Sequence, residues 1–152
     1  FSPVSDMQRA CSTQTDKLYA NPQQNENIIR SMQEIEKRVL KELLVMHPNN
    51  YQALGRMSEI NFRQGNYKDA YEWINKYIDL KRDDYNLFLF RGQVQLELGD
   101  SLGAAKSFYR AVQLGGQQPL AQDFWQRRLS RKTQEEVVNL MKTQTQNTDA
   151  TK

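Results

Sequence analysis

Gly65 and Gly99 lie 34 residues apart, and the sequence around them repeats at the same period. The matched positions are mostly apolar, and the pairs are Ile60 and Val94, Ala70 and Ala104, Ile74 and Phe108, Ile78 and Val112, and Leu80 and Leu114. The turn repeats as well, because Gly65-Asn66 recurs as Gly99-Asp100. Self-similarity at this period is typical of stacked helix-turn-helix units. Such arrays present surfaces to partners, so the repeat constrains the class of mechanism more than the identity of a partner.

Each repeat unit contains two runs of apolar residues at steps of three and four, which predict amphipathic helices rather than strands. Gly65 is expected to end a first helix, because glycine adopts positive φ at little cost. Asn66 and Asp100 suit the start of the second helices, where a side-chain oxygen accepts hydrogen bonds from free backbone N–H groups. Ala70 and Ala104 stand where a small side chain lets two helices approach closely.

The two units resemble the tetratricopeptide repeat, which carries an aromatic residue, Leu-Gly, Tyr, a small residue, a second aromatic residue and a last small residue at fixed places. The matching residues are Leu54 and Phe88, Met57-Ser58 and Arg91-Gly92, Ala70 and Ala104, Ile74 and Phe108, and Tyr77 and Ala111. Asn61 and Gln95 replace the family's Tyr, and Tyr77 is large for its position. The resemblance implies an all-α fold, in which antiparallel helix hairpins stack as a short right-handed α-solenoid.

The same resemblance suggests how the chain is divided. We expect N-terminal helices with a degenerate half repeat at 1–50, repeats at 51–84 and 85–118, C-terminal capping helices at 119–142, and a disordered tail at 143–152. One period before Ala70, the small position of the partial repeat is occupied by Glu36. The tail is polar and lacks large apolar residues, which favours disorder.

Further helices are expected on either side of the two clear repeats. A weak helix over 5–19 is followed by one long helix over about 26–46. Pro119 is expected to open a capping helix, since its ring favours the φ of a first helical turn. Thr133 and Glu136 have the spacing of a capping box and predict the start of a last helix.

The composition favours a thin helical array over a globule with a deep core, because only 38% of residues are hydrophobic and the mean hydropathy is −0.83. The net charge of +3 is mild, and no apolar run reaches the length of a membrane span. The single Cys11 excludes an internal disulfide. We expect a soluble protein, either cytoplasmic or, if the N-terminus at Phe1 results from processing, mitochondrial or periplasmic.

Groups that could perform chemistry are isolated along the sequence. His47, the only histidine, has no nearby acid or thiol to orient or activate it. Cys11 is interpreted as an inert thiol, because Arg9 is its only basic neighbour. The acidic pairs at 83–84 and 135–136 fall at expected helix starts, where carboxylates act as caps. We therefore expect no catalytic residues, no metal site, no cofactor and no enzymatic activity.

In the tetratricopeptide repeat family, the first helices of successive units line a concave groove. The residues that the resemblance places there are Gln52, Glu59, Phe62 and Arg63 in the first unit, and Asn86, Leu89, Gln93 and Glu97 in the second. Phe62 and Leu89 are equally compatible with burial in the core. One branch of the family grips a C-terminal carboxylate with Lys, Asn and Arg. Here Glu59 and Gln93 replace the Asn, and Gly55 and Leu89 replace the Lys, so an extended peptide or a helix is the expected ligand.

One basic patch lies close to Trp125. It consists of Arg127, Arg128, Arg131 and Lys132, which we expect on one helix. The patch could contact phosphate, an anionic lipid headgroup or an acidic partner, or it could be the solvated face of the cap. Nucleic acid is not the expected partner, because the predicted groove contains Glu59 and Glu97 and the basic residues gather only at one end.

These patterns predict a non-catalytic protein–protein interaction module. It would act as an assembly factor or as a structural subunit of a larger complex, and would bind a protein partner through the concave repeat face. Two alternatives stay open. One is an RNA-binding helical repeat protein that uses the basic patch, and the other is a secretion-type chaperone.

Overall fold

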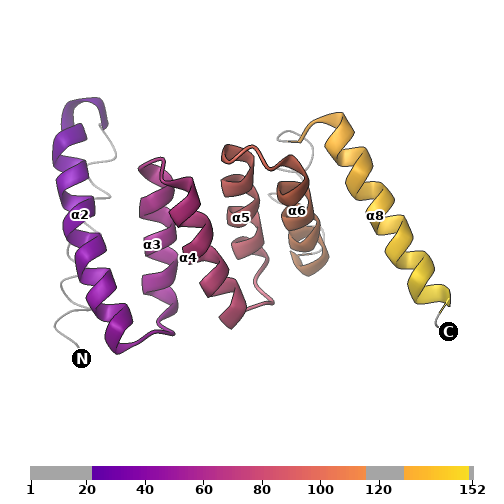
Figure 1. The fold of residues 1–152 in the computed structure, drawn as a ribbon, viewed down its shortest axis with the longest axis horizontal. Coiled ribbons are helices and arrows are strands. Elements are labelled where there is room, and N and C mark those ends of the chain that lie inside the picture. The colour runs from indigo at the N-terminus through magenta and orange to yellow at the C-terminus, as the bar shows by residue number, and fades with distance from the viewer. Residues whose placement is uncertain (1–21, 116–128, 151–152) are drawn as a thin grey trace. The chain divides into compact units, whose positions relative to one another are not determined.

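The computed structural model describes residues 22–115 and 129–150, and every regular element in these two ranges is a helix (Figure 1). The helices are α2 (Pro22–Met46), α3 (Tyr51–Arg63), α4 (Tyr67–Leu80), α5 (Tyr85–Glu97), α6 (Ser101–Gly115) and α8 (Arg131–Ala150). The chain divides into two compact units, Phe1–Tyr77 and Ile78–Lys152. The prediction of an all-α fold made of helix hairpins is confirmed.

The long helix expected over about 26–46 is present as α2. The helix is interrupted once, at Asn25, where φ is −116° and ψ is 15°. Beyond this kink its buried residues recur at steps of three and four, as expected for a helix with one face against a core. These residues are Ile29, Gln33, Glu36, Val39, Leu40, Leu43 and Leu44.

The core of the first unit forms where the C-terminal half of α2 meets α3. Its buried side chains are Leu40, Leu43, Leu44, Ala53, Leu54, Met57 and Ile60, with Trp73 and Tyr77 of α4 packed against them. Asn50 caps α3, because its side-chain oxygen accepts a hydrogen bond from the Ala53 N–H at 3.0 Å. The short connector of 47–50 thus turns the chain back and brings α3 beside α2.

Both predicted hairpin turns use glycine for its backbone freedom. Gly65 has φ of 78° and Gly99 has φ of 79°, and a Cβ added at either residue would meet nothing within 4 Å. The requirement at these turns is therefore the left-handed backbone conformation and not space. Asp100 caps α6 as expected, accepting from the Gly103 N–H at 2.9 Å, whereas the Asn66 side chain donates to Gln64 at 3.2 Å.

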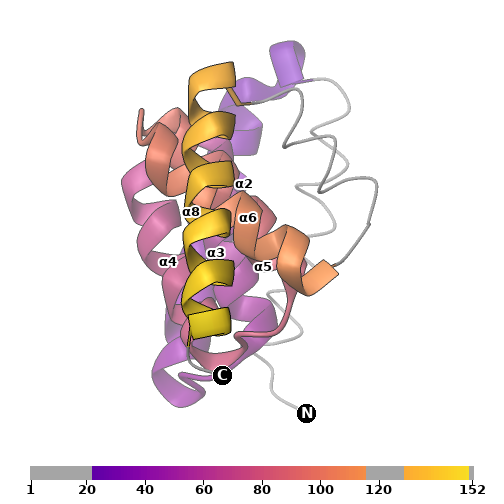
Figure 2. The ribbon, with the colours of Figure 1, turned by 90° about the vertical axis from the view of Figure 1, so that its right-hand side faces the viewer.

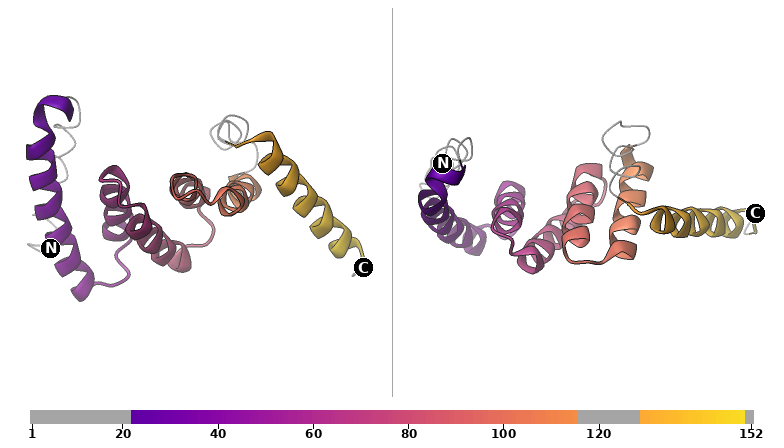
Figure 3. Two further views of the ribbon diagram at one scale, coloured as in Figure 1. Left: turned by 45° about the horizontal axis from the view of Figure 1, so that its top comes forward. Right: turned by 90° about the horizontal axis from the view of Figure 1, so that it is seen from above.

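In the second unit, α5 and α6 form an antiparallel pair whose two axes run side by side in both panels of Figure 3. Phe108 is fully buried and lies directly against Gly92, where an added Cβ would come within 2.5 Å of the ring. Ala104 is also fully buried, as is Ala70 in the first unit, and this confirms the prediction for both small positions. Asp84 caps α5 by accepting from the Asn86 N–H at 3.0 Å.

The last helix differs from the sequence prediction at both ends. α8 begins at Arg131, one turn before the expected start, because Ser130 is the cap and accepts from the Thr133 N–H at 3.2 Å. The expected disorder over 143–152 is wrong as far as Ala150, since α8 is continuous to that residue (Figure 2). The segment contains no Pro or Gly, and extending an existing helix needs no new nucleation step.

Other predicted elements lie outside the described residues. They are the weak helix over 5–19 and the capping helix that opens at Pro119. Among the helices that are described, none combines the length and the apolar character that a membrane span requires.

Candidate partner-binding surfaces

The residues predicted to face a groove from α3 are accessible to different degrees. Gln52 is exposed, while the Glu59 and Arg63 side chains are 39% and 38% exposed. Phe62 is partly exposed and packs edge-to-face against Tyr67, with ring centroids 5.4 Å apart. This helix therefore offers one free amide, one partly covered ring and two charges along its length.

The two charges belong to a chain of ion pairs inside the first unit. Arg63 Nη2 lies 2.8 Å from Glu59 Oε1, and Arg56 Nη1 lies 3.2 Å from Glu59 Oε2. Glu59 thus contacts a guanidinium on each side. Because these two ion pairs offset much of its negative charge, Glu59 attracts a cationic partner more weakly than the sequence alone suggests.

At the buried end of this chain of ion pairs lies Glu36, whose role the sequence did not predict. Its carboxylate is fully buried and receives two hydrogen bonds from Arg56, Nε to Oε2 at 2.8 Å and Nη2 to Oε1 at 3.2 Å. A buried carboxylate needs such a partner, because its desolvation is costly. The available signal was a glutamate in the small position of the repeat, which implies a cation nearby without naming it.

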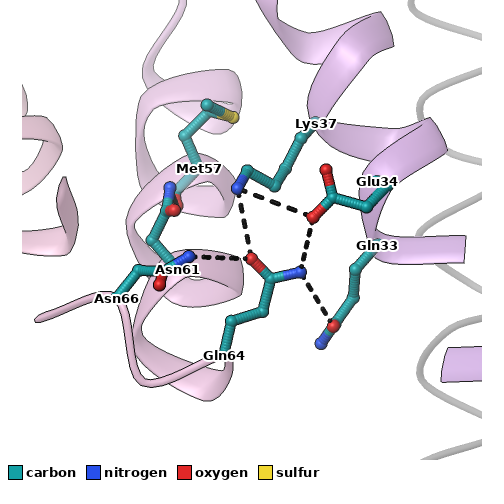
Figure 4. Close-up of polar contacts among 7 residues, drawn as sticks. All are labelled: Gln33, Glu34, Lys37, Met57, Asn61, Gln64 and Asn66. Atoms are coloured by element: carbon teal, nitrogen blue, oxygen red, sulfur yellow. Dashed lines mark hydrogen bonds and ion pairs between the residues drawn. The ribbon is translucent and has the colours of Figure 1, made fainter. Parts of the chain in front are cut away.

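A second polar junction between α2 and α3 centres on Gln64, the residue that ends α3 (Figure 4). Its amide oxygen accepts from Lys37 Nζ at 3.1 Å and from Asn66 Nδ2 at 3.2 Å. Its amide nitrogen donates to Gln33 Oε1 at 3.1 Å and to Glu34 Oε1 at 3.0 Å. One side chain therefore joins the end of the first hairpin helix to the preceding helix.

The residues predicted to face a groove from α5 do not all reach the surface. Asn86 and Glu97 are exposed and Gln93 is partly exposed. Leu89 is only 3% exposed, so of the two alternatives for this residue the core holds and the groove does not. The physical reason is space. One period earlier, Gly55 leaves room for the ring of Tyr77, whereas the second unit has the small Ala111 and the larger Leu89 at the same two positions.

The first unit also contains an apolar pocket that periodicity did not reveal. We call it the Trp73 pocket; its volume is about 460 Å³, and it is lined by Lys41, Leu44, Val45, Pro48, Leu54, Trp73 and Lys76. The residues come from the end of α2, the following connector, α3 and α4. No sequence pattern joins these positions, because only the packing of three helices brings them together.

The basic patch is only partly within the described residues. Arg127 and Arg128 lie outside them, while Arg131 and Lys132 are exposed in the first turn of α8. Residues 129–130 are not helical and Arg131 begins a new helix, so the expectation of all four residues on one helix is wrong. Arg131 Nε lies 3.5 Å from Glu135 Oε1, which offsets part of its charge.

The residues that the sequence analysis considered for chemistry lie at helix ends, where the structure describes them. His47 is exposed just after α2, and Asp84 caps α5. No group of three or more potential metal-ligating side chains occurs in the part of the chain that the structure describes. Cys11 lies outside that part.

Neither a protein-family model nor a curated protein sequence matches the chain. Solved structures do match. Two structures of MamA align with TM-scores of 0.59 and 0.61 at 18% and 17% identity, over 77% and 90% of this chain. The alignments cover 63% and 65% of the MamA chains, so this chain spans slightly less than two thirds of their length.

Two smaller structures align over nearly their whole length. The first TPR of Spaghetti (RPAP3), bound to an HSP90 peptide, has a TM-score of 0.60 at 13% identity over 90% of this chain and 94% of that one. PcrH, in complex with the chaperone binding region of PopD, has a TM-score of 0.54 at 14% identity over 90% and 95%. Sequence period, glycine-closed hairpins and structural likeness agree, and the chain has the fold of a tetratricopeptide repeat protein.

Proposed function

We propose that the protein is a non-catalytic protein–protein interaction module that binds an extended peptide or a helix through the first helices of its repeats. The observation that carries the proposal is that the first helix of each repeat has accessible polar side chains, at positions 52, 59 and 63 of α3 and at positions 86, 93 and 97 of α5. Two structures of similar fold are described as complexes with a peptide or a binding region of another protein. A role as assembly factor or structural subunit follows from such binding.

The chemistry of these positions favours neutral polar recognition over a charge clamp. The amides of Gln52, Asn86 and Gln93 can each donate and accept, which suits the backbone of an extended segment. Glu59 and Arg63 pair with one another, so neither is a free charge aimed at a terminal group. This is consistent with the absence of the Lys and Asn that a carboxylate-binding groove needs.

The structure affects the two alternative functions differently. A secretion-type chaperone remains compatible, since it would use the same fold and the same polar positions, and PcrH has a similar fold. The RNA-binding alternative loses one supporting argument, because Arg131 and Lys132 begin a separate helix and Arg131 pairs with Glu135. We therefore retain a protein as the proposed partner.

Affinity capture with two matched double variants tests the proposal. Q52R/N86R replaces one exposed amide on the first helix of each repeat by a bulky cation, and N27R/N139R replaces two exposed amides elsewhere in the same way. The partner captured by the unmodified protein from its native source should be retained by N27R/N139R and bound about tenfold more weakly by Q52R/N86R. Equal binding to both variants, with unchanged thermal unfolding, would move the interface away from the first helices.

A further inference from the structure

The Trp73 pocket has an apolar floor and an accessible rim. Leu44 and Leu54 are 9% and 2% exposed and form the floor, while Val45 is 82% exposed at the rim. Exposed apolar residues that surround a concavity are unusual on a protein that stays alone in water, and they favour contact with another molecule. None of the residues that line the pocket is one of the proposed groove residues.

The charged residues that line the Trp73 pocket all have one sign. Its lining contains two ammonium groups, those of Lys41 and Lys76, and no carboxylate. Lys76 Nζ lies over the Trp73 ring, 4.3 Å from the ring centroid, so this cation is held at the wall of the pocket. Its position leaves the ammonium group accessible to a partner's carboxylate.

The pocket lysines differ from other cations of the same unit. Lys37, Arg56 and Arg63 each pair with a carboxylate of α2 or α3. Among the described residues, no carboxylate pairs with Lys41 or Lys76, and both side chains are exposed. Two unpaired ammonium groups beside an apolar cavity are complementary to an apolar side chain with carboxylates next to it.

We propose that the Trp73 pocket binds a short acidic segment of a protein partner, with one bulky apolar side chain inserted between Leu44, Leu54 and Trp73. The volume of about 460 Å³ fits one large side chain and its neighbouring backbone. The adjacent carboxylates of the segment pair with Lys41 and Lys76. Nucleic acid supplies negative charge but no aliphatic side chain for the cavity, so a peptide is the better occupant.

A random linear peptide library displayed on phage tests this inference without knowledge of the natural partner. Selection on the unmodified protein should enrich peptides in which a bulky apolar residue is flanked by Asp or Glu. A selected peptide should shift the amide resonances of Val45 and Lys76 and the indole resonance of Trp73 in a ¹⁵N-labelled sample. Failure to enrich such peptides, or shifts confined to other surfaces, would overturn the proposal.

Two matched pairs of variants place the binding in the pocket. V45E adds a carboxylate to the rim at an 82% exposed residue, and M46E adds one at the neighbouring residue, which is 52% exposed and does not line the pocket. The selected peptide should bind V45E at least about tenfold more weakly than M46E. Equal affinities for the two variants would contradict insertion at this rim.

The second pair tests the two lysines. K41E/K76E reverses both pocket charges, while K68E/K106E makes the same change at exposed lysines outside the lining. Only K41E/K76E should lose affinity for the acidic peptide. A version of that peptide with Lys in place of each acidic residue should have a higher affinity for K41E/K76E than for the unmodified protein. Binding that responds equally to both pairs would reflect net charge alone and would sink the proposal. Because Q52R/N86R leaves the pocket intact, it should bind the selected peptide normally, so this inference and the proposed groove can fail separately.

Discussion

Two copies of the small position of the repeat are filled in opposite ways. In the second unit it is Ala104, which is fully buried in a hairpin where Gly92 lets α5 touch Phe108 of α6. Two periods earlier, in the partial repeat that precedes the repeat of Ala70, the position is Glu36, which is equally buried but carries a charge and pairs with Arg56. The comparison teaches that one position of this fold accepts either a small side chain that permits close approach or a carboxylate that brings its own partner.

At two further positions the large and the small side chain are exchanged between the units. Gly55 and Tyr77 of the first unit are a small and a large residue, and one period later Leu89 and Ala111 are a large and a small one. Tyr77 uses the room to stack on Tyr51, with ring centroids 5.6 Å apart. Such exchanges keep the filled volume similar while they change which residue supplies it.

The largest effect is expected from breaking the buried ion pair. R56M should reduce the free energy of unfolding by about 3–5 kcal/mol, because it leaves the Glu36 carboxylate buried without its guanidinium. Urea unfolding followed by circular dichroism measures the change. A cost below about 1 kcal/mol would mean that the Glu36 carboxylate reaches water in the variant.

The matched control gives the partial repeat the small residue that the two full repeats have. E36A/R56M restores the small residue of the repeat and removes both charges, so it should recover most of the stability that R56M loses. A double variant as unstable as R56M would contradict the idea that the two solutions are interchangeable at this position.

The next effect concerns close helix approach in the second unit. G92A places a Cβ within 2.5 Å of the buried Phe108 ring and should cost about 1–3 kcal/mol. One period earlier stands Ser58, whose Oγ donates to the Leu54 carbonyl of its own helix. S58A should cost less than about 1 kcal/mol, since it removes only that local bond. A cost of G92A no larger than that of S58A in urea unfolding would show that the Phe108 ring moves aside to admit the added Cβ.

A size exchange in the first unit should have a smaller effect. G55L should cost about 1–2 kcal/mol, because a Cβ at this residue already lies 3.1 Å from Cε2 of Tyr77. G55L/Y77A carries the leucine and alanine of the second unit, and it should be more stable than the sum of the two single changes predicts. Additive thermal unfolding data would argue against direct contact between these two positions.

The smallest effect is expected at the helix ends. Q64L removes the amide that bonds Gln33, Glu34 and Lys37, and should cost about 1 kcal/mol. One period later stands Leu98, which is 44% exposed, so L98Q should change the stability by less than about 0.5 kcal/mol. If L98Q costs as much as Q64L, the end of α5 is engaged in contacts that its exposure does not reveal.

The features that could be predicted from the sequence are those that depend on local backbone chemistry. The two hairpins, the left-handed turns at Gly65 and Gly99, the cap at Asp100 and the buried small residue at Ala104 all follow from periodicity, from the conformational freedom of glycine and from the hydrogen bonds that a helix start requires. The local rules also had limits, since Ser130 and Thr133 are both good caps and a short-range pattern does not choose between them.

Which side chains from different helices meet depends on the tertiary structure. Glu36 and Arg56 are 20 residues apart in sequence, and their pairing follows only from the packing of α2 on α3. The burial of Leu89 depends on how much space its surroundings leave, and the Trp73 pocket gathers residues from three helices and a connector. Periodicity specifies which face of a helix is apolar, but the volumes and charges that oppose that face belong to other segments, so contacts of this kind exist only once the helices have packed.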